Sequence, residues 1–143
     1  MAGNRRKSRE IALQVLYQLD VQEQLTEDQG LTLFYQSFGR EDDDSDEASQ
    51  AFANELVRGA KQHAEEIDAL ITKASRNWRL ERMARVDRNL LRLAVYELKY
   101  STDVPSKVAI NEAIEIAKRY GTAESPAFVN GILDRCLEEI GPR

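Results

Sequence analysis

Positive charge near the start of the sequence is the clearest chemical signal in this chain. Residues 1–9 contain four basic residues and no acidic one: Arg5, Arg6, Lys7 and Arg9. A guanidinium group donates planar pairs of hydrogen bonds that match phosphate oxygens, so a dense group of arginines suits a nucleic-acid backbone. The alternative is a solvated tail that only keeps the chain soluble, and the composition alone does not decide between the two.

Aromatic residues and predicted helix starts form a second candidate surface. Lys107 lies at the start of one predicted helix, and Glu124 and Phe128 lie at the start of another. Backbone amides at helix N-termini receive phosphate oxygens, and exposed rings stack on the bases of single-stranded RNA. Tyr17 lies outside the main apolar stripe of its helix and offers a further ring. The alternative for both aromatic residues is a place at the edge of the core.

The formal net charge of −5 would ordinarily argue against a nucleic-acid partner. The charge is unevenly distributed, however, because residues 41–47 hold six acids in seven positions. Without these acids the net charge is +1, and residues 76–92 form a second basic stretch with six arginines against Glu81 and Asp87. Like charges at such density repel each other, so we expect residues 40–47 to form a solvated loop between helices.

Catalytic and metal-binding chemistry finds no support in the sequence. The chain has one histidine, His63, and one cysteine, Cys136, which is too few for a His/Cys zinc site or an internal disulfide. The seven glycines are scattered and form no phosphate-binding loop. We therefore expect no enzyme, no metal and no cofactor. A single cysteine and the lack of a run of about 18 apolar residues fit a reducing compartment, the cytoplasm, and no membrane.

Hydrophobic residues recur at helical spacing almost throughout the chain, and no segment alternates as a strand would. Ser8 is a candidate N-cap of the first helix, Gly121 is a candidate C-terminal cap, and Ser125 with Pro126 is typical of a helix start. The predicted helices have apolar stripes over residues 11–19, 28–38, 52–57, 67–74, 86–100, 108–120 and 129–140.

These stripes predict an all-α fold, a compact domain of about seven helices. The chain is long enough for one domain with a shared core. We expect that domain to span residues 1–143, with an N-terminal helical half of about residues 1–75 and a C-terminal half of about residues 76–143.

Several segments resemble, in order, the NusB family of transcription antitermination factors. The N-terminal part reads RRKSRE at 5–10 and ALQVLY at 12–17, and the middle part reads DRNLLRLAVYEL at 87–98. The most specific segments read VPSKVAINEAIEIAK at 104–118 and FVNGILD at 128–134. The resemblance spans nearly the whole chain, and only residues 20–50 match poorly.

The resemblance implies an all-helical fold of two subdomains and a set of partners. These are boxA RNA in nascent ribosomal RNA transcripts, the ribosomal small-subunit protein NusE, and the RNA polymerase antitermination complex. It also implies roles for individual residues. Phosphate contacts would come from Arg5, Arg6, Lys7 and Arg9. Contacts with the bases and the backbone of the RNA would come from Tyr17, Lys107 and Phe128, and Glu124 would influence RNA affinity. Contacts with NusE would come from Glu81 and Asp87.

Two other functions stay open beside an antitermination factor that performs no catalysis. One is an RNA-binding module of a ribosomal RNA cytosine methyltransferase, since such enzymes carry a related domain. The other is a helical protein–protein adaptor whose basic tail only solubilises it, which RNA binding would distinguish. The oligomeric state is not fixed by the sequence, so a homodimer is also left open.

Overall fold

The computed structural model describes residues 2–38, 47–76 and 78–141. In this part of the chain it has seven α-helices, one short 3-10 helix and no strand, which confirms the all-α fold. The elements are α1 (Ala2–Val21), α2 (Glu27–Phe38), α3 (Glu47–Gln62), α4 (Ala64–Ala74), η1 (Leu80–Arg82), α5 (Arg85–Tyr100), α6 (Ser106–Tyr120) and α7 (Ser125–Ile140). The predicted acidic loop lies outside the described residues, apart from Glu47, which begins α3.

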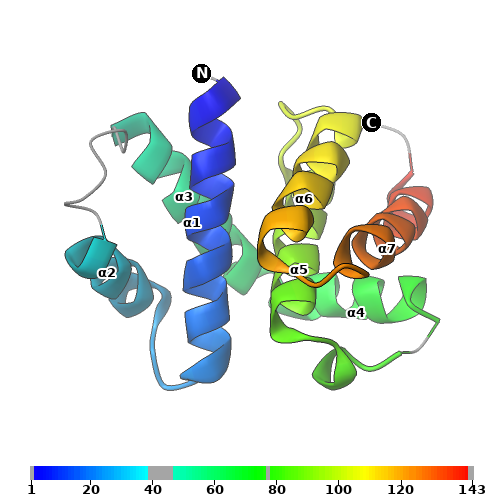
Figure 1. Cartoon of the computed structure of the whole chain (residues 1–143), viewed down its shortest axis with the longest axis horizontal. Helices are drawn as coiled ribbons and strands as arrows, with labels where there is room; N and C mark the ends of the chain where they lie inside the picture. Colours follow the sequence, from blue (N-terminus) through cyan, green and yellow to red (C-terminus); the bar gives the residue numbers. More distant parts are fainter. Residues whose placement is uncertain (1, 39–46, 77, 142–143) are drawn as a thin grey trace.

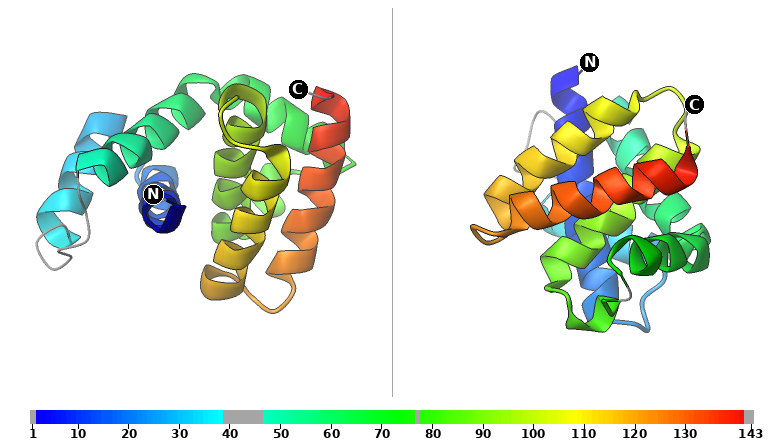
Figure 2. Two further views of the ribbon diagram at one scale, coloured as in Figure 1. Left: turned by 90° about the horizontal axis from the view of Figure 1, so that it is seen from above. Right: turned by 90° about the vertical axis from the view of Figure 1, so that its right-hand side faces the viewer.

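Helix α1 lies between two groups of helices. Figures 1 and 2 show α2 and α3 on one side of α1, and α5, α6 and α7 on the other. One hydrophobic core connects the groups, since buried residues from both belong to the same cluster. Helix α4 belongs to the N-terminal half in the expected division at about residue 75, but it packs against α5 and α7.

Helix α5 contributes much of the core. Its apolar residues recur on one face as the sequence predicts, and six of them are buried: Leu90, Leu91, Leu93, Ala94, Val95 and Leu98. Burial of a Leu or Val side chain contributes about 1.5–3 kcal/mol to folding. Because α5 packs against α1, α3, α4, α6 and α7, it positions the α-helices that carry predicted site residues.

The predicted N-cap at Ser8 is wrong, because α1 begins six residues earlier at Ala2. Ser8 is buried inside the helix, and its hydroxyl donates a hydrogen bond to the carbonyl oxygen of Ser49 at 2.7 Å. The basic segment before it extends the helix, since arginine and lysine are good helix formers. A true capping box occurs at α2, where Thr26 and Gln29 exchange side-chain-to-amide hydrogen bonds of 2.9 and 3.2 Å.

The turn between α6 and α7 depends on Gly121. This residue caps α6 as predicted, but its φ of −97° is one that any residue can adopt. Glycine is needed there because a Cβ would lie 2.3 Å from the hydroxyl oxygen of Ser125. That oxygen accepts a hydrogen bond from the Thr122 amide at 2.9 Å, and Ser125 is the first residue of α7 instead of its N-cap.

A buried ion pair joins α1 to α5. Arg9 donates two hydrogen bonds to the carboxylate of Glu97, with N–O distances of 2.7 and 2.8 Å. The side chains of Arg9 and Glu97 are only 4% and 2% exposed. Two charges removed from water in this way are tolerated only when each satisfies the other. The pair therefore fixes the position of α1 against α5.

Further arginines of α5 tie this helix to its neighbours. Arg88 donates two hydrogen bonds to Asp20 at the end of α1, and Arg92 donates two to Asp68 in α4. Burial alone would raise the pKa of Asp20, but hydrogen bonds from Arg88 and Asn89 outweigh it and lower the pKa. Part of the second basic stretch is thus used inside the fold.

We expect Arg9→Ala to destabilise the protein by about 3–5 kcal/mol, because Glu97 would remain buried without a partner. The double variant Arg9→Met with Glu97→Leu should recover most of this loss, since hydrophobic residues of similar size replace both charges. Urea unfolding measures each effect. Arg58→Ala is the control: its pair with Asp28 is exposed, so the loss should stay below about 1 kcal/mol. Equal losses from both single variants would contradict the prediction.

Candidate nucleic-acid interface

The N-terminal basic residues lie where α1 runs beside α6. Arg6 donates two hydrogen bonds to the carboxylate of Glu112, from Nε at 2.9 Å and from Nη2 at 2.6 Å. Arg119 in turn donates to Glu10, with a distance of 3.0 Å to Oε2. Because residue 6 meets residue 112 and residue 10 meets residue 119, the two helices run in the same direction (Figure 1).

The four N-terminal basic residues fall into two groups. Arg5, Arg6 and Lys7 are at least partly exposed, and Arg6 is 46% exposed despite its pair with Glu112. Arg5 lies 3.5 Å from Asp103, and its guanidinium carbon lies 4.5 Å from the centre of the Phe52 ring. Arg9 is buried against Glu97, so a phosphate contact from Arg9 would require breaking that pair.

The carboxylate of Glu112 lies beside two arginines, the partly exposed Arg6 and the buried Arg9. It binds Arg6 and also lies 3.6 Å from the guanidinium of buried Arg9. The hydrogen bonds from Arg6 hold the pKa of Glu112 below its usual range, although burial alone would raise it. The same pair raises the pKa of Arg6. Glu112 thus keeps its negative charge and holds the Arg6 guanidinium beside α6.

Sequence reasoning missed this pairing for a simple reason. Glu112 is 106 residues from Arg6, and no local pattern connects them. A signal did exist for Arg9, which precedes buried Ala12 and Leu16 by three and seven residues. These spacings place it on the buried stripe of α1.

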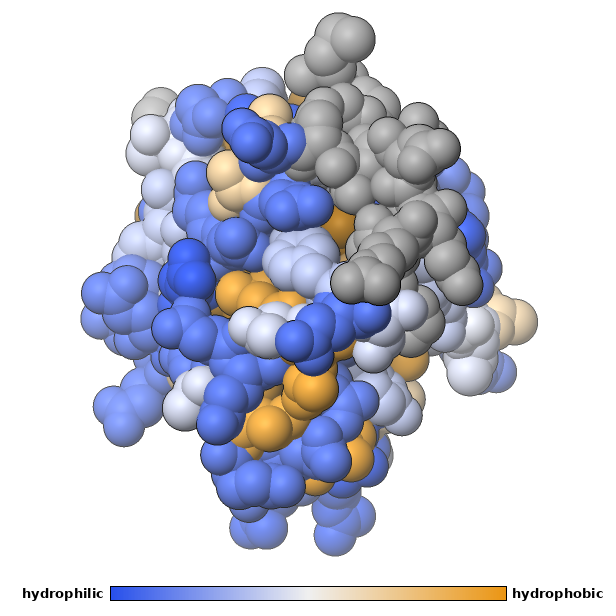
Figure 3. Space-filling model, turned by 90° about the vertical axis from the view of Figure 1, so that its left-hand side faces the viewer, coloured by the Kyte–Doolittle hydropathy of each residue, from blue (hydrophilic) through white to orange (hydrophobic). Residues whose placement is uncertain are grey.

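Tyr17 lies at the edge of a hollow where four helices meet. The hollow has a volume of about 550 Å³, and its lining includes Leu13 of α1, Phe34 of α2, Val86 of α5 and Tyr120 of α6. Tyr17 is 38% exposed, so its ring lies partly outside the core as the sequence indicates. The face of the molecule on the α2 side is mostly hydrophilic, and hydrophobic residues show there as separate areas between hydrophilic ones (Figure 3).

The residues predicted around the two helix starts do not share one pocket. Lys107 is exposed in the first turn of α6, whereas Glu124 is exposed directly before α7. Helix α6 lies between them, and its 15 residues span about 20 Å. Phe128 is half-buried and packs against the core from α7. Lys107 therefore lies at the end of α6 that faces Arg5, and Glu124 follows the end that faces Tyr17.

The two acids predicted to contact a protein partner differ in exposure. Glu81 is exposed on η1. Asp87 is only 9% exposed in the first turn of α5, and its Oδ1 has no hydrogen-bond partner among the described residues. Of the two, only Glu81 presents its side chain to a partner in this conformation.

His63 and Cys136, the two residues with catalytic potential, are packed against other residues of the fold. The His63 ring stacks on Tyr100 with ring centres 3.9 Å apart. Cys136 is buried, and burial raises the pKa of its thiol to about 12, which keeps it protonated and unreactive. Within the described residues, no His, Cys, Asp or Glu side chains gather in a group of three that could hold a metal ion. The same part of the chain has no helix long and apolar enough to cross a membrane.

The profile of the NusB family matches residues 6–138, nearly the whole chain. This protein belongs to the NusB family. The transcription antitermination protein NusB of Myxococcus xanthus is 50% identical over 133 residues, which cover 93% of this chain and 94% of that protein. The NusB protein of Trichlorobacter lovleyi is 52% identical over 132 residues, 92% and 89% of the two chains.

Solved structures of NusB proteins share the fold. T. maritima NusB superposes with a TM-score of 0.84 at 40% identity, covering 96% of this chain and 93% of that one. A crystal structure of the antitermination factors NusB and NusE in complex with double-stranded RNA contains a chain that matches with a TM-score of 0.83 at 27% identity, over 97% and 99% of the two chains. The resemblance found in the sequence motifs is thus confirmed, and the chain is grouped with transcription antitermination factors and not with enzymes.

The pair of Arg6 and Glu112 predicts a pH dependence of stability. A carboxyl group with a lowered pKa stabilises the fold above its ordinary pKa of about 4.3, and this contribution is lost as the pH falls through the lower value of the folded state. Thermal unfolding should therefore show a higher Tm for the wild type than for Glu112→Gln at pH 7. The difference should shrink as the pH falls below the ordinary pKa of a glutamate, and a difference that grows on acidification would contradict the role of the pair.

Proposed function

We propose that this protein binds boxA-type single-stranded RNA in nascent ribosomal RNA transcripts together with NusE, and so supports processive transcription by RNA polymerase. One observation carries the proposal: the basic residues Arg5 and Arg6 and the exposed ring of Tyr17 lie on one helix, α1, and Arg6 and Tyr17 lie along its border with α6. Cations for phosphates and a ring for bases are the two elements that single-stranded RNA requires.

The pairing of Arg6 is compatible with this role. A guanidinium has five N–H donors, and Glu112 engages donors on Nε and Nη2 only. The remaining donors of an arginine that is 46% exposed are available to a phosphate oxygen. A guanidinium already held in place loses less conformational freedom on binding than a mobile one.

Comparison with relatives supports the same function. A chain of the same fold occurs in the complex of NusB and NusE with RNA. The curated relatives are named transcription antitermination proteins, and the chain covers 89% and 94% of the two described above. This favours an antitermination factor over a module of a methyltransferase. Bacterial transcription takes place in the cytoplasm, so we propose that compartment, with residues 1–143 acting as one RNA-binding domain.

The proposed NusE contact rests on fewer observations. NusE is expected to be basic, so an acidic surface would complement it. Glu81 meets this requirement, and we retain it with Asp87 as candidate NusE contacts. Lys107, Glu124 and Phe128 are retained as candidate RNA contacts at the two ends of α6.

The N-terminal assignment predicts a change in the salt dependence of RNA binding. Each phosphate contact on single-stranded RNA contributes about −0.7 to the slope of log affinity against log salt. The variant Arg5→Gln, Arg6→Gln, Lys7→Gln should bind boxA RNA more weakly, with a slope less negative by about 2. Fluorescence anisotropy at several salt concentrations measures this.

A matched control removes the same charge elsewhere. Arg58, Lys61 and Lys73 are exposed on α3 and α4. Their replacement by Gln should leave the slope nearly unchanged. Equal slopes for the wild type and the N-terminal variant would refute the assignment.

Tyr17 should contribute through its ring. Tyr17→Ala should weaken boxA RNA binding by about 1–3 kcal/mol if a base stacks on it, whereas Tyr17→Phe should bind nearly as well as the wild type. Isothermal titration measures both. Phe128→Ala distinguishes stacking from packing: a loss of thermal stability with unchanged RNA affinity would assign Phe128 to the core.

A further inference from the structure

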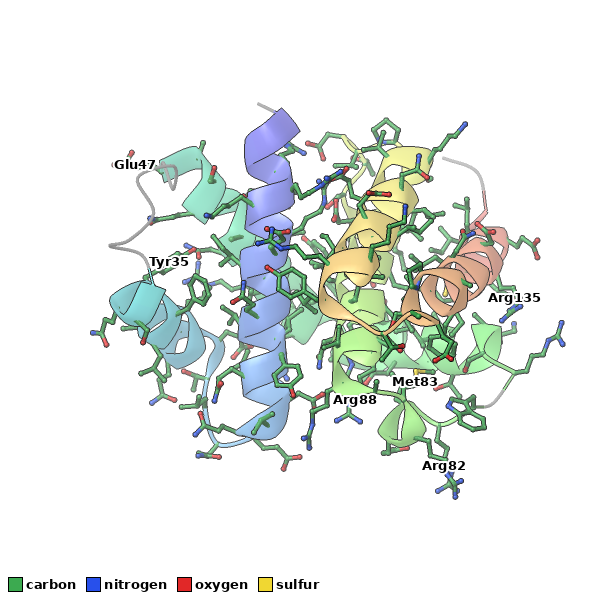
Figure 4. All side chains as sticks on the ribbon, in the orientation of Figure 1. Tyr35, Glu47, Arg82, Met83, Arg88 and Arg135 are labelled. Atoms are coloured by element: carbon green, nitrogen blue, oxygen red, sulfur yellow. The ribbon has the colours of Figure 1, made fainter. Side chains whose placement is uncertain are left out.

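The connection between α4 and α5 carries a group of exposed arginines that the proposed function leaves unused. We name it the arginine patch, and it consists of Arg76, Trp78, Arg79, Arg82 and Arg85. All five side chains are exposed, and Trp78 is 50% exposed although tryptophan is normally well covered. Figure 4 shows Arg82 extending from η1 away from the body of the protein.

The arginines of the patch differ from those that follow in the same basic stretch. Arg88 and Arg92 are bound to Asp20 and Asp68 in the interior. None of the four patch arginines forms an ion pair with any residue that the structure describes. Residues 76–85 contain a single acid, Glu81, against four arginines, so the segment has a net charge of +3.

The backbone under the patch is held on both sides. Met83 is buried in the core, and Arg88 donates a hydrogen bond to the carbonyl oxygen of Leu80 at 3.1 Å. The hydroxyl of Ser75 donates a hydrogen bond to the carbonyl oxygen of Trp78 at 3.0 Å. The exposed side chains from Trp78 onward thus extend from a backbone that is held at Trp78, Leu80 and Met83, which reduces the ordering that binding would require.

Charge and residue type indicate what the patch binds. Four guanidinium groups attract a polyanion and repel a basic protein. An exposed tryptophan among arginines suits single-stranded RNA, because the ring stacks on a base of any sequence while the guanidinium groups bind phosphates. The segment has a net charge of +3, so its four arginines suit an anion, and the candidate NusE contact at Glu81 is a separate one that does not involve them.

We propose that the arginine patch is a second RNA contact, which binds the single strand next to the boxA element without reading its sequence. This inference rests on the proposed function for the location of boxA. The patch is continuous with that location, since Val86, directly after Arg85, lines the same hollow as Tyr17 and Tyr120. The pair of Asp20 and Arg88 places the patch near the C-terminal end of α1, so Tyr17 lies between it and the N-terminal arginines.

The test compares two RNAs and two variants of the whole protein. One RNA is boxA alone, and the other carries an added single strand of roughly eight nucleotides of unrelated sequence, tested on either side. The variant Arg79→Gln, Arg82→Gln, Arg85→Gln should bind the extended RNA about tenfold more weakly, with a salt slope less negative by about 2. It should bind boxA alone as the wild type does. The control variant Arg58→Gln, Lys61→Gln, Lys73→Gln should keep both affinities.

The single tryptophan of the chain provides a second measurement. Stacking of a base on Trp78 should quench its fluorescence when the extended RNA binds, and boxA alone should leave the signal nearly unchanged. All the substituted arginines are exposed, so circular dichroism should show variants that fold as the wild type does.

Other outcomes separate this inference from the proposed function. If the patch variant binds the extended RNA as tightly as the wild type, the inference is wrong even when boxA binds. If the variant loses only affinity for NusE measured without RNA, the patch is a protein contact and the inference is likewise wrong. If the wild type binds the unrelated single strand through the patch but shows no preference for boxA, the proposed function fails and the patch stands.

Discussion

The buried pair of Arg9 and Glu97 is the interaction on which the rest of this structure depends. Helix α1 has helices on both sides, and its contact with α5 is the point where two full charges meet away from water. A buried charge is tolerated only with its partner in place, so the pair admits one position of α1 along α5. That position brings Arg6 to Glu112 and Glu10 to Arg119, and it thereby defines the border of α1 and α6 on which the proposed RNA contacts lie.

Arginine serves three purposes in this chain, and only the surroundings distinguish them. Arg9 is buried and structural, Arg6 is paired but partly exposed, and Arg82 is exposed with no ion pair among the described residues. The formal net charge of −5 does not distinguish these three kinds of arginine. Local charge decides whether a polyanion can approach, because the attraction between exposed charges is screened within roughly 10 Å at moderate salt.

The proposed RNA face is extended, with its contacts distributed along two helices. Parallel α1 and α6 place basic residues at one end and aromatic residues at the other, about 20 Å apart. A folded ligand would need a pocket, whereas a single strand can follow such a border. The carboxylates of Glu10 and Glu112 keep the arginines ordered along it and limit how strongly the protein attracts other polyanions.

The sequence by itself determined the helices, the core stripes and the family. Helical periodicity is a local property, so Leu90 and Leu98 could be assigned to the core and α5 could be predicted with no knowledge of its neighbours. Only the tertiary structure decided that Arg9 is buried against Glu97, that Arg6 binds Glu112, and that Arg88 and Arg92 bind Asp20 and Asp68. Each of these depends on residues far apart in the chain, and the pairing of side chains across helices follows from packing geometry, which no local pattern encodes.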